Sequence, residues 1–332
     1  MRFSRVNDRM KKDYAVSIAK GIGIIGVVAH HLANRRFPEV ERSWIALPGQ
    51  LCLWAVPLFI VVSGYLHAGS HARHPTPPGV FLLARVRRLL IPYAIISLVY
   101  AIVYSLLIRA GLLNDALGEP AAWYKLWWGS LTLNGGVGEQ LYFLPLLFVV
   151  SMAALLPLTL VRYTPGPLLF MAAILVAAPF LRPDLLAQIP GHMVWPWDRF
   201  VAGVGLYLVG FLLQVQPTWR LRLFSVTVVL VAAAAFAGRT TAAHFLFSVV
   251  IFAGLLLSKP RARPLELTGD ASGTIFLYHT PFFLQPLLVL IATKTPASWH
   301  VLLAMVALLG TVAFFTIAHH ILLRTRLRRL AF

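Results

Sequence analysis

The chain of 332 residues is 59% hydrophobic and only 12% charged, and its mean hydropathy is +0.79. Soluble globular proteins carry about 25% charged residues, so this composition excludes a soluble globule and indicates a protein surrounded by lipid. The net charge of +18 would suggest nucleic-acid binding in a soluble protein. Here the basic residues lie in short segments between apolar runs, which indicates orientation in a membrane and no nucleic-acid partner.

Ten apolar runs follow one another along the chain. About 20 apolar residues cross the hydrocarbon core as a helix, and neither loops nor open sheet edges can face lipid. The sequence therefore predicts an all-α, polytopic bundle of about ten transmembrane helices that forms a single domain over residues 1–332. The runs are Tyr14–Leu32, Leu47–Leu66, Leu89–Ile108, Leu141–Val161, Leu168–Leu181, Phe200–Leu213, Leu221–Ala237, Ala242–Leu257, Ser272–Ala292 and Val301–Leu323.

The basic residues predict which side of the membrane the two ends of the chain occupy. With ten spans, 19 of the 29 Lys and Arg residues fall in the termini and in the connections on the same side as the termini. An excess of Lys and Arg marks the cytoplasmic side. Both termini are therefore predicted to be cytoplasmic, and an odd number of spans would abolish this separation of charge.

The first predicted span contains ionisable residues, which are costly in lipid and by default indicate a site facing the bundle interior. Lys20 and His31 are 11 residues apart, which places them on nearly one helix face and about 16 Å apart along the axis. His30 points about 100° away from His31. Alternatively, Lys20 extends to the cytoplasmic headgroups and the two histidines end the helix. A metal site is not expected, because adjacent histidines point apart.

Arginines open the third predicted span on its cytoplasmic side, at Arg85, Arg87 and Arg88. Such residues usually determine topology, but their planar, permanently charged guanidinium groups also suit the recognition of phosphate. His279 lies inside the ninth predicted span, where a single histidine is most often a hydrogen-bonded packing residue.

The outer side of the bundle is predicted to carry the longest connection, Gly111–Gln140, with the aromatic cluster Trp123–Trp128. Aromatic side chains in this place form a belt at the membrane surface, or they stack on sugar rings. Glu139 stands at the outer end of the fourth span, as an interfacial carboxylate or as a residue of a site.

Four stretches stand in an order and spacing that together are specific. The first is a frame of Ser17, Lys20, Gly21 and His31, and the others are Pro57–Leu66, Arg85–Tyr93, and Leu141–Pro145 combined with Ser272–Pro281. Together they resemble the membrane acyltransferase-3 family, which acylates the hydroxyl groups of glycans, antibiotics and other acceptors. The first stretch is most similar to the branch with fucose 4-O-acetyltransferase-like members, and the resemblance covers essentially the whole chain.

The sequence departs from the family pattern at two positions of the first stretch. Ser17 stands where the family has Asp, and Lys20 stands where many members have Arg. The lost carboxylate removes a partner of the basic residue. Asp13, one helical turn earlier, is a candidate to replace it.

The resemblance implies a membrane O-acyltransferase of the bacterial inner membrane, with acetyl-CoA as the acyl donor. The phosphates of CoA would bind Arg85, Arg87 or Arg88, and Lys20 would assist. The glycines at positions 21, 23 and 26 let neighbouring helices or a thin ligand approach the first span. The pantetheine arm is therefore expected to run along this face toward His31, which would act as general base.

The acceptor implied by the resemblance is a hydroxyl group of a glycan or a lipid-linked glycan. Some residues are candidates to contact the substrate or to stabilise the oxyanion, and the sequence does not choose among Ser63, Tyr65, Glu139, Tyr142 and His279. A covalent acyl-histidine route is an alternative to base catalysis.

Two other functional classes compete with the enzyme. In a polytopic transporter, Lys20 and His31 would form a proton or substrate relay, although no internal repeat is visible and carboxylates are scarce within the spans. In a scaffold subunit of a polysaccharide assembly complex, the motifs would be degenerate and the chain would not be catalytic.

Overall fold

The computed structural model describes residues 13–33, 51–109, 139–161, 164–181, 197–279, 283–284, 287, 290–291 and 294–325. These residues form helices and connections without a strand, which confirms the all-α prediction. The elements are α1 (Tyr14–Ala33), α3 (Ala55–Arg73), α4 (Pro78–Arg85), η2 (Val86–Leu90), α5 (Ile91–Arg109), η3 (Glu139–Tyr142), α7 (Phe143–Ala153), α8 (Leu155–Leu160), α9 (Pro165–Leu181), α11 (Trp197–Val215), η4 (Pro217–Trp219), α12 (Arg220–Phe236), α13 (Thr240–Ser258), α14 (Arg263–Asp270), α15 (Ser272–His279), η6 (Ala297–Trp299) and α17 (His300–Leu323).

Helices long and apolar enough to cross a membrane make up much of the described chain. Six such spans are Tyr14–Leu32, Pro78–Val103, Phe143–Leu160, Pro217–Phe236, Thr240–Ser258 and His300–Leu323. Two shorter apolar helices cover Pro165–Pro179 and Phe200–Val215. Each of the ten predicted runs contains a helical segment, whereas ten complete crossings and the side of the termini stay predictions.

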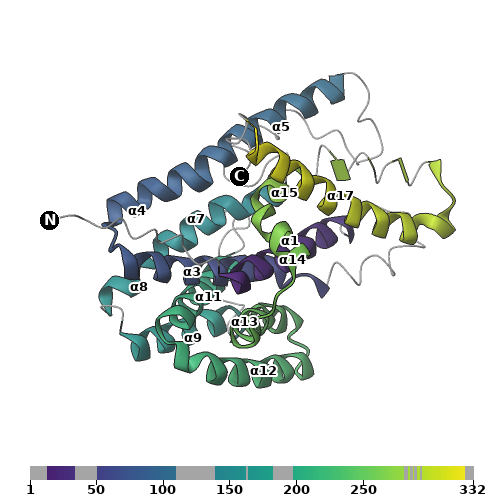
Figure 1. Ribbon diagram of the computed structural model, residues 1–332. Coiled ribbons are helices and arrows are strands. Elements are labelled where there is room, and N and C mark those ends of the chain that lie inside the picture. Colours follow the sequence, from purple (N-terminus) through teal and green to yellow (C-terminus); the bar gives the residue numbers. More distant parts are fainter. Residues whose placement is uncertain are drawn as a thin grey trace.

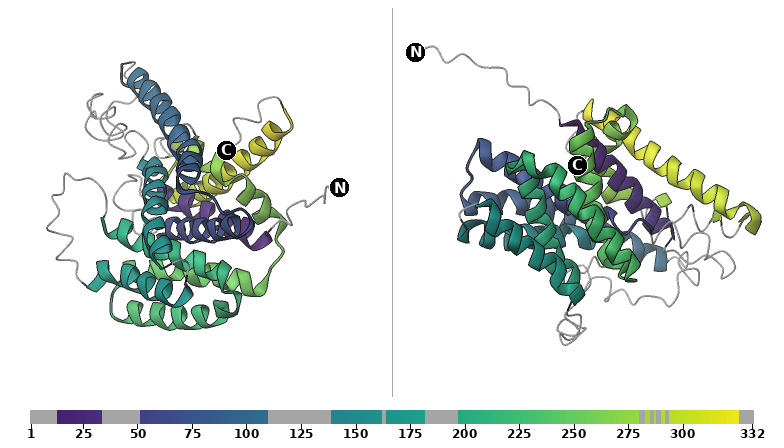
Figure 2. Two further views of the ribbon diagram at one scale, coloured as in Figure 1. Left: turned by 90° about the vertical axis from the view of Figure 1, so that its left-hand side faces the viewer. Right: turned by 90° about the horizontal axis from the view of Figure 1, so that it is seen from below.

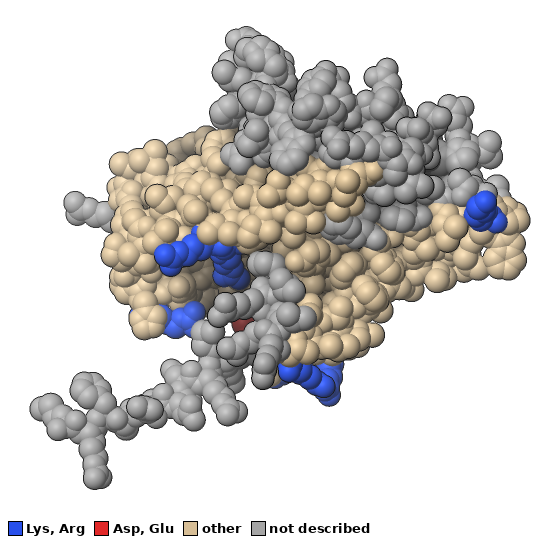
Figure 3. All heavy atoms as spheres, turned by 90° about the horizontal axis from the view of Figure 1, so that it is seen from above, with Lys and Arg blue, Asp and Glu red and all other residues tan. Residues whose placement is uncertain are grey.

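The outward faces of α5, α12 and α17 are apolar and exposed. Ile95, Val229 and Leu309 are examples, with exposed fractions of 54%, 66% and 61%. Figure 3 shows a described surface that is largely uncharged, with Lys and Arg gathered in a few clusters. Apolar area of this extent is compatible with lipid rather than with water.

Helix α1 lies within the bundle and contacts α3, α13, α14, α15 and α17 (Figures 1 and 2). Behind it, α3 and α11 pack backbone against backbone, because each contributes a glycine to the contact. A Cβ atom on Gly64 would fall on the carbonyl group of Tyr207, and one on Gly210 would fall on that of Val61. Small residues that bring backbones together are the usual means of helix association in lipid.

The third predicted span begins earlier than expected. The prediction that Arg85, Arg87 and Arg88 open this helix is therefore wrong. Helix α4, the π-helical turn η2 and α5 follow one another from residue 78 to residue 109 (Figure 1). The arginines therefore lie inside a long helix rather than at its start. Pro92 lacks the N–H that would bond the carbonyl of Arg88, and its ring clashes there, which accounts for the widened turn.

The connection predicted between the eighth and ninth spans contains a helix, α14. It begins with Pro264 near its N-terminus and Glu266 in its first turn, both of which are favoured there. It ends at Asp270, and α15 starts two residues later. The chain thus brings an acidic residue to the side of α1.

Candidate active site

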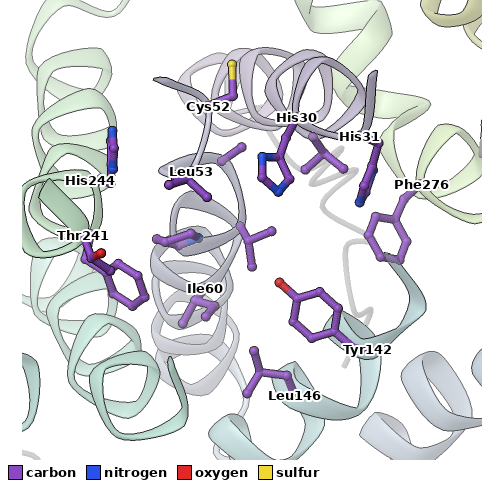
Figure 4. Close-up of a pocket in the computed structure, with 15 residues that line it drawn as sticks. His30, His31, Cys52, Leu53, Ile60, Tyr142, Leu146, Thr241, His244 and Phe276 are labelled. Carbon is purple, nitrogen blue, oxygen red and sulfur yellow. The ribbon is translucent and has the colours of Figure 1, made fainter. Parts of the chain in front are cut away.

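A cavity of about 320 Å³ lies at the end of the bundle where α1 ends and α3 begins (Figure 4). This volume is at the lower end of the range for small-molecule sites. None of the described residues that line it is Asp, Glu, Lys or Arg. Its polar lining residues are His30, His31, Cys52, Tyr142, Thr241 and His244. Within the described ranges, no three His, Cys, Asp or Glu side chains form a possible metal-binding group.

His31 reaches the cavity from the last turn of α1, and so does its neighbour His30. The 100° between successive helical residues led us to expect His30 to point elsewhere. Both rings border the cavity because it surrounds the end of the helix, and their centroids are 5.8 Å apart. In Figure 4, the ring of His30 and the hydroxyl group of Tyr142 point into the space.

His31 is hydrogen-bonded to His279, and we assign the hydrogens on both rings from their hydrogen-bond partners. Nδ1 of His31 lies 3.0 Å from Nε2 of His279, whose Nδ1 lies 2.8 Å from the carbonyl oxygen of Ile275. A carbonyl oxygen can only accept, so Nδ1 of His279 carries a hydrogen and Nε2 of the neutral ring accepts. Nδ1 of His31 is therefore the donor, and Nε2 of His31 is the basic nitrogen.

His279 is rigidly held, because α15 is tied to two other helices. Its side chain is fully buried. Tyr100 of α5 donates a hydrogen bond to the carbonyl oxygen of Leu277, and Thr274 pairs with Nδ1 of His319 on α17 at 2.8 Å. His279 also lies at the C-terminal end of α15, where the helix dipole favours positive charge. The pair is thus suited to stabilise an imidazolium ion on His31.

The other candidates for contact with the substrate or the oxyanion differ in whether they line the cavity. Tyr142 lines the cavity. Ser63 donates to the carbonyl oxygen of Phe59 in its own helix at 2.8 Å, and Tyr65 donates to Oδ2 of Asp13 at 3.0 Å. Neither of these two lines the cavity. Glu139 begins η3, but its side chain and the aromatic cluster Trp123–Trp128 lie outside the described residues.

Arg85, Arg87 and Arg88, called the arginine group below, lie away from the cavity. Arg85 contacts residues beside the C-terminal half of α3. Nη2 of Arg85 donates to the hydroxyl group of Tyr207 at 3.2 Å, and its guanidinium group lies 4.9 Å from the centre of the Phe81 ring. Phe81 stacks on His67 of α3, with centroids 4.4 Å apart. His67 is 7 residues beyond the cavity residue Ile60, or about 10 Å along the helix. Arg87 and Arg88 on the same turn are exposed.

Asp13, the candidate to replace the missing carboxylate at position 17, binds the start of α1 and Tyr65. Its Oδ1 accepts from the backbone N–H of Ala15 at 3.1 Å, which caps α1, and its Oδ2 binds Tyr65. The hydroxyl group of Ser17 instead donates to Oδ1 of Asp270 at 3.1 Å. Sequence reasoning missed Asp270, because it lies in a segment predicted to be a connection.

The glycines of α1 are covered by neighbouring helices, which is one of the two roles expected for them. A Cβ atom on Gly21 would meet the backbone of α14 at Leu265. One on Gly23 would lie 3.0 Å from Phe59, and one on Gly26 would lie 2.9 Å from Ala55, both on α3. At these three positions the close approach is made by α14 and α3, and the course of a pantetheine arm stays a prediction.

Comparison with known proteins places the chain in one family. The family model described as an acyltransferase domain, of the acyltransferase-3 type, matches residues 13–323. No curated protein and no solved structure matches the chain. The match extends over the cavity, the histidine pair and the arginine group alike.

Proposed function

The chain belongs to the acyltransferase-3 family, and on this premise we propose that it transfers an acetyl group from cytoplasmic acetyl-CoA to a hydroxyl group of a glycan. Membership makes it a multi-pass membrane O-acyltransferase. The bacterial inner membrane, the acetyl donor and the glycan acceptor are parts of the proposal. The observation that carries it is the orientation of His31, whose basic nitrogen follows from its bond to His279 at a cavity of substrate size.

The proposed reaction begins with proton transfer to His31. Nε2 of His31 takes the proton of the acceptor hydroxyl group while its oxygen attacks the thioester carbonyl carbon. The C–O double bond opens to an oxyanion, which the hydroxyl group of Tyr142 is placed to stabilise by donating a hydrogen bond. The oxyanion then collapses, the C–S bond breaks, and the proton on His31 passes to the departing thiolate of CoA.

Donor and acceptor are proposed to bind near opposite ends of α3. The phosphates of CoA carry charge that lipid excludes, and the arginine group offers cations about 10 Å from the cavity along α3. A thin acyl-bearing arm of CoA can span this separation. The excess of Lys and Arg supports an orientation in which this end and both termini face the cytoplasm and the cavity faces the outer side.

The lining of the cavity supports the proposal that the acceptor is a neutral molecule with hydroxyl groups. The described lining combines imidazole, hydroxyl and apolar side chains and contains no charged residue type other than histidine. Such a lining suits a neutral group with hydroxyls, such as one sugar ring, better than a phosphate or a carboxylate.

The decisive experiment measures acetyl transfer by purified protein. Acetyl-CoA is supplied with neutral methyl glycosides, and CoA release and acetylated sugar are followed by chromatography. We expect His31→Ala to lose activity by about 10²–10⁴-fold, because the general base is removed. His74→Ala, an exposed histidine beyond the end of α3, serves as the matched control and is expected to keep wild-type activity. Full transfer by His31→Ala at matched folding would refute the assignment.

The same assay separates the competing functions. A transporter or a non-catalytic subunit of an assembly complex would consume no thioester with any acceptor. An acyl-histidine route would leave acetylated enzyme after incubation with acetyl-CoA alone, and peptide mass analysis detects it. Direct base catalysis leaves none.

A further inference from the structure

A carboxylate from α14 lies beside α1 at Ser17, the position at which the family resemblance leads us to expect Asp. Oδ1 of Asp270 accepts a hydrogen bond from the hydroxyl group of Ser17 at 3.1 Å. The two residues are 253 positions apart in the chain. Ser17 is 7% exposed and Asp270 is half-buried, so water screens this carboxylate only in part.

The approach of the two helices allows little freedom in this placement. Gly269 of α14 sits against the backbone of α1, and a Cβ atom there would lie 3.0 Å from the backbone nitrogen of Gly21 and would fall on the carbonyl group of Ser17. Gly21 in turn sits against Leu265 of α14. Two glycines therefore hold Asp270 beside one face of α1.

Lys20 lies on that face. It is three residues after Ser17, which puts the two side chains on neighbouring positions of the helix surface. Lys20 is half-buried. An ammonium group in such a place needs a counter-charge, because its transfer from water is costly.

We propose that Asp270 is the counter-charge that positions Lys20, in place of the carboxylate missing from position 17. The proposal rests on the proposed function in one respect, namely that Lys20 helps to hold the acyl donor. Asp270 then acts through Lys20 as a positioning residue and has no contact with the reacting atoms. Moving the carboxylate back to α1 should preserve the arrangement.

The first test is independent of activity. Thermal unfolding in detergent is compared for wild type, Lys20→Met, Asp270→Asn and the double variant. If the two charges interact, Asp270→Asn lowers Tm, by about 2–4 °C or more, and the double variant loses clearly less than the sum of the single losses. Additive losses would overturn the proposal. Glu266→Gln, at another half-buried carboxylate on α14, is the control: it loses only a favourable charge near the helix N-terminus, so its effect on Tm should be the same with Lys or Met at position 20.

The second test moves the carboxylate. With acetyl-CoA as the varied substrate, Asp270→Asn should lower kcat/KM by about tenfold, and Ser17→Asp combined with Asp270→Ser should restore most of it. A swap variant that folds but stays as impaired as Asp270→Asn would refute the positioning role. Wild-type protein that consumes no acetyl-CoA would refute the proposed function instead, and the unfolding experiment would still decide whether the charges pair.

Discussion

Replacing His279 examines the link between the histidine pair and catalysis most directly. His279→Phe keeps the aromatic bulk but removes the acceptor for Nδ1 of His31. A hydrogen bond to a charged group contributes about 1.5–3 kcal/mol, and His31 is charged once it holds the proton of the acceptor. At about 1.4 kcal/mol per factor of ten, the loss corresponds to about 10- to 140-fold in kcat. KM for acetyl-CoA should stay unchanged, because the arginine group lies elsewhere.

His279→Gln tests whether residue 279 orients His31 through a hydrogen bond or only fills space beside it. The amide oxygen of glutamine can accept the hydrogen on Nδ1 of His31, so this variant should recover most of the activity that His279→Phe loses. The assay is acetyl transfer to methyl glycosides at saturating acetyl-CoA, with thermal unfolding as the check on folding. Wild-type kcat in His279→Phe would show that the pair does not set the tautomer of His31. Equal and severe losses in both variants at unchanged Tm would refute the acceptor role of His279.

Two further substitutions test the donor end and the helix packing. Arg85→Gln should raise KM for acetyl-CoA about tenfold with kcat little changed, because it removes a cation from the end proposed to bind the CoA phosphates. Arg239→Gln, at the start of α13 on the cavity side, is the control and should alter neither value. Gly64→Ala should lower Tm by several degrees, because the new methyl group overlaps a backbone carbonyl and overpacking costs about 1–3 kcal/mol. Gly310→Ala, with open space around it, should leave Tm unchanged or raise it, and equal losses in the two glycine variants would contradict the packing argument.

Much of the candidate site could be predicted from local sequence. An ionisable residue in an apolar run singles out His31, its role as general base comes from the family resemblance, and the cavity lies where the run ends. The spacing from Lys20 predicted two ends of one helix, and Lys20 and His31 do lie toward opposite ends of α1. Tyr142 was one of several oxyanion candidates, and its neighbours along the chain did not distinguish it from Ser63 or Tyr65.

The differences from what the sequence predicts have a common physical origin. Charge usually ends an apolar run, which predicts the arginines at a helix start, whereas Arg85 lies inside a helix, where it contacts Tyr207 and Phe81. Closeness in sequence favours Asp13 as the carboxylate near position 17. The carboxylate that bonds Ser17 comes from α14, an element whose mixed composition resembles a connection.

The sequence by itself indicated that this protein is surrounded by lipid, that it is helical and to which family it belongs. It also singled out the histidine, lysine and arginine residues of the candidate site. These follow from composition, from the length of apolar runs and from motifs of a few residues, because lipid imposes the same requirement on every exposed backbone segment. Only the tertiary structure showed which side chains form hydrogen bonds with these residues. His31 meets His279 across 248 positions and Ser17 meets Asp270 across 253, because glycines let particular helices approach each other closely. Side-chain contacts of that kind depend on the packing of whole helices, which short-range patterns do not specify.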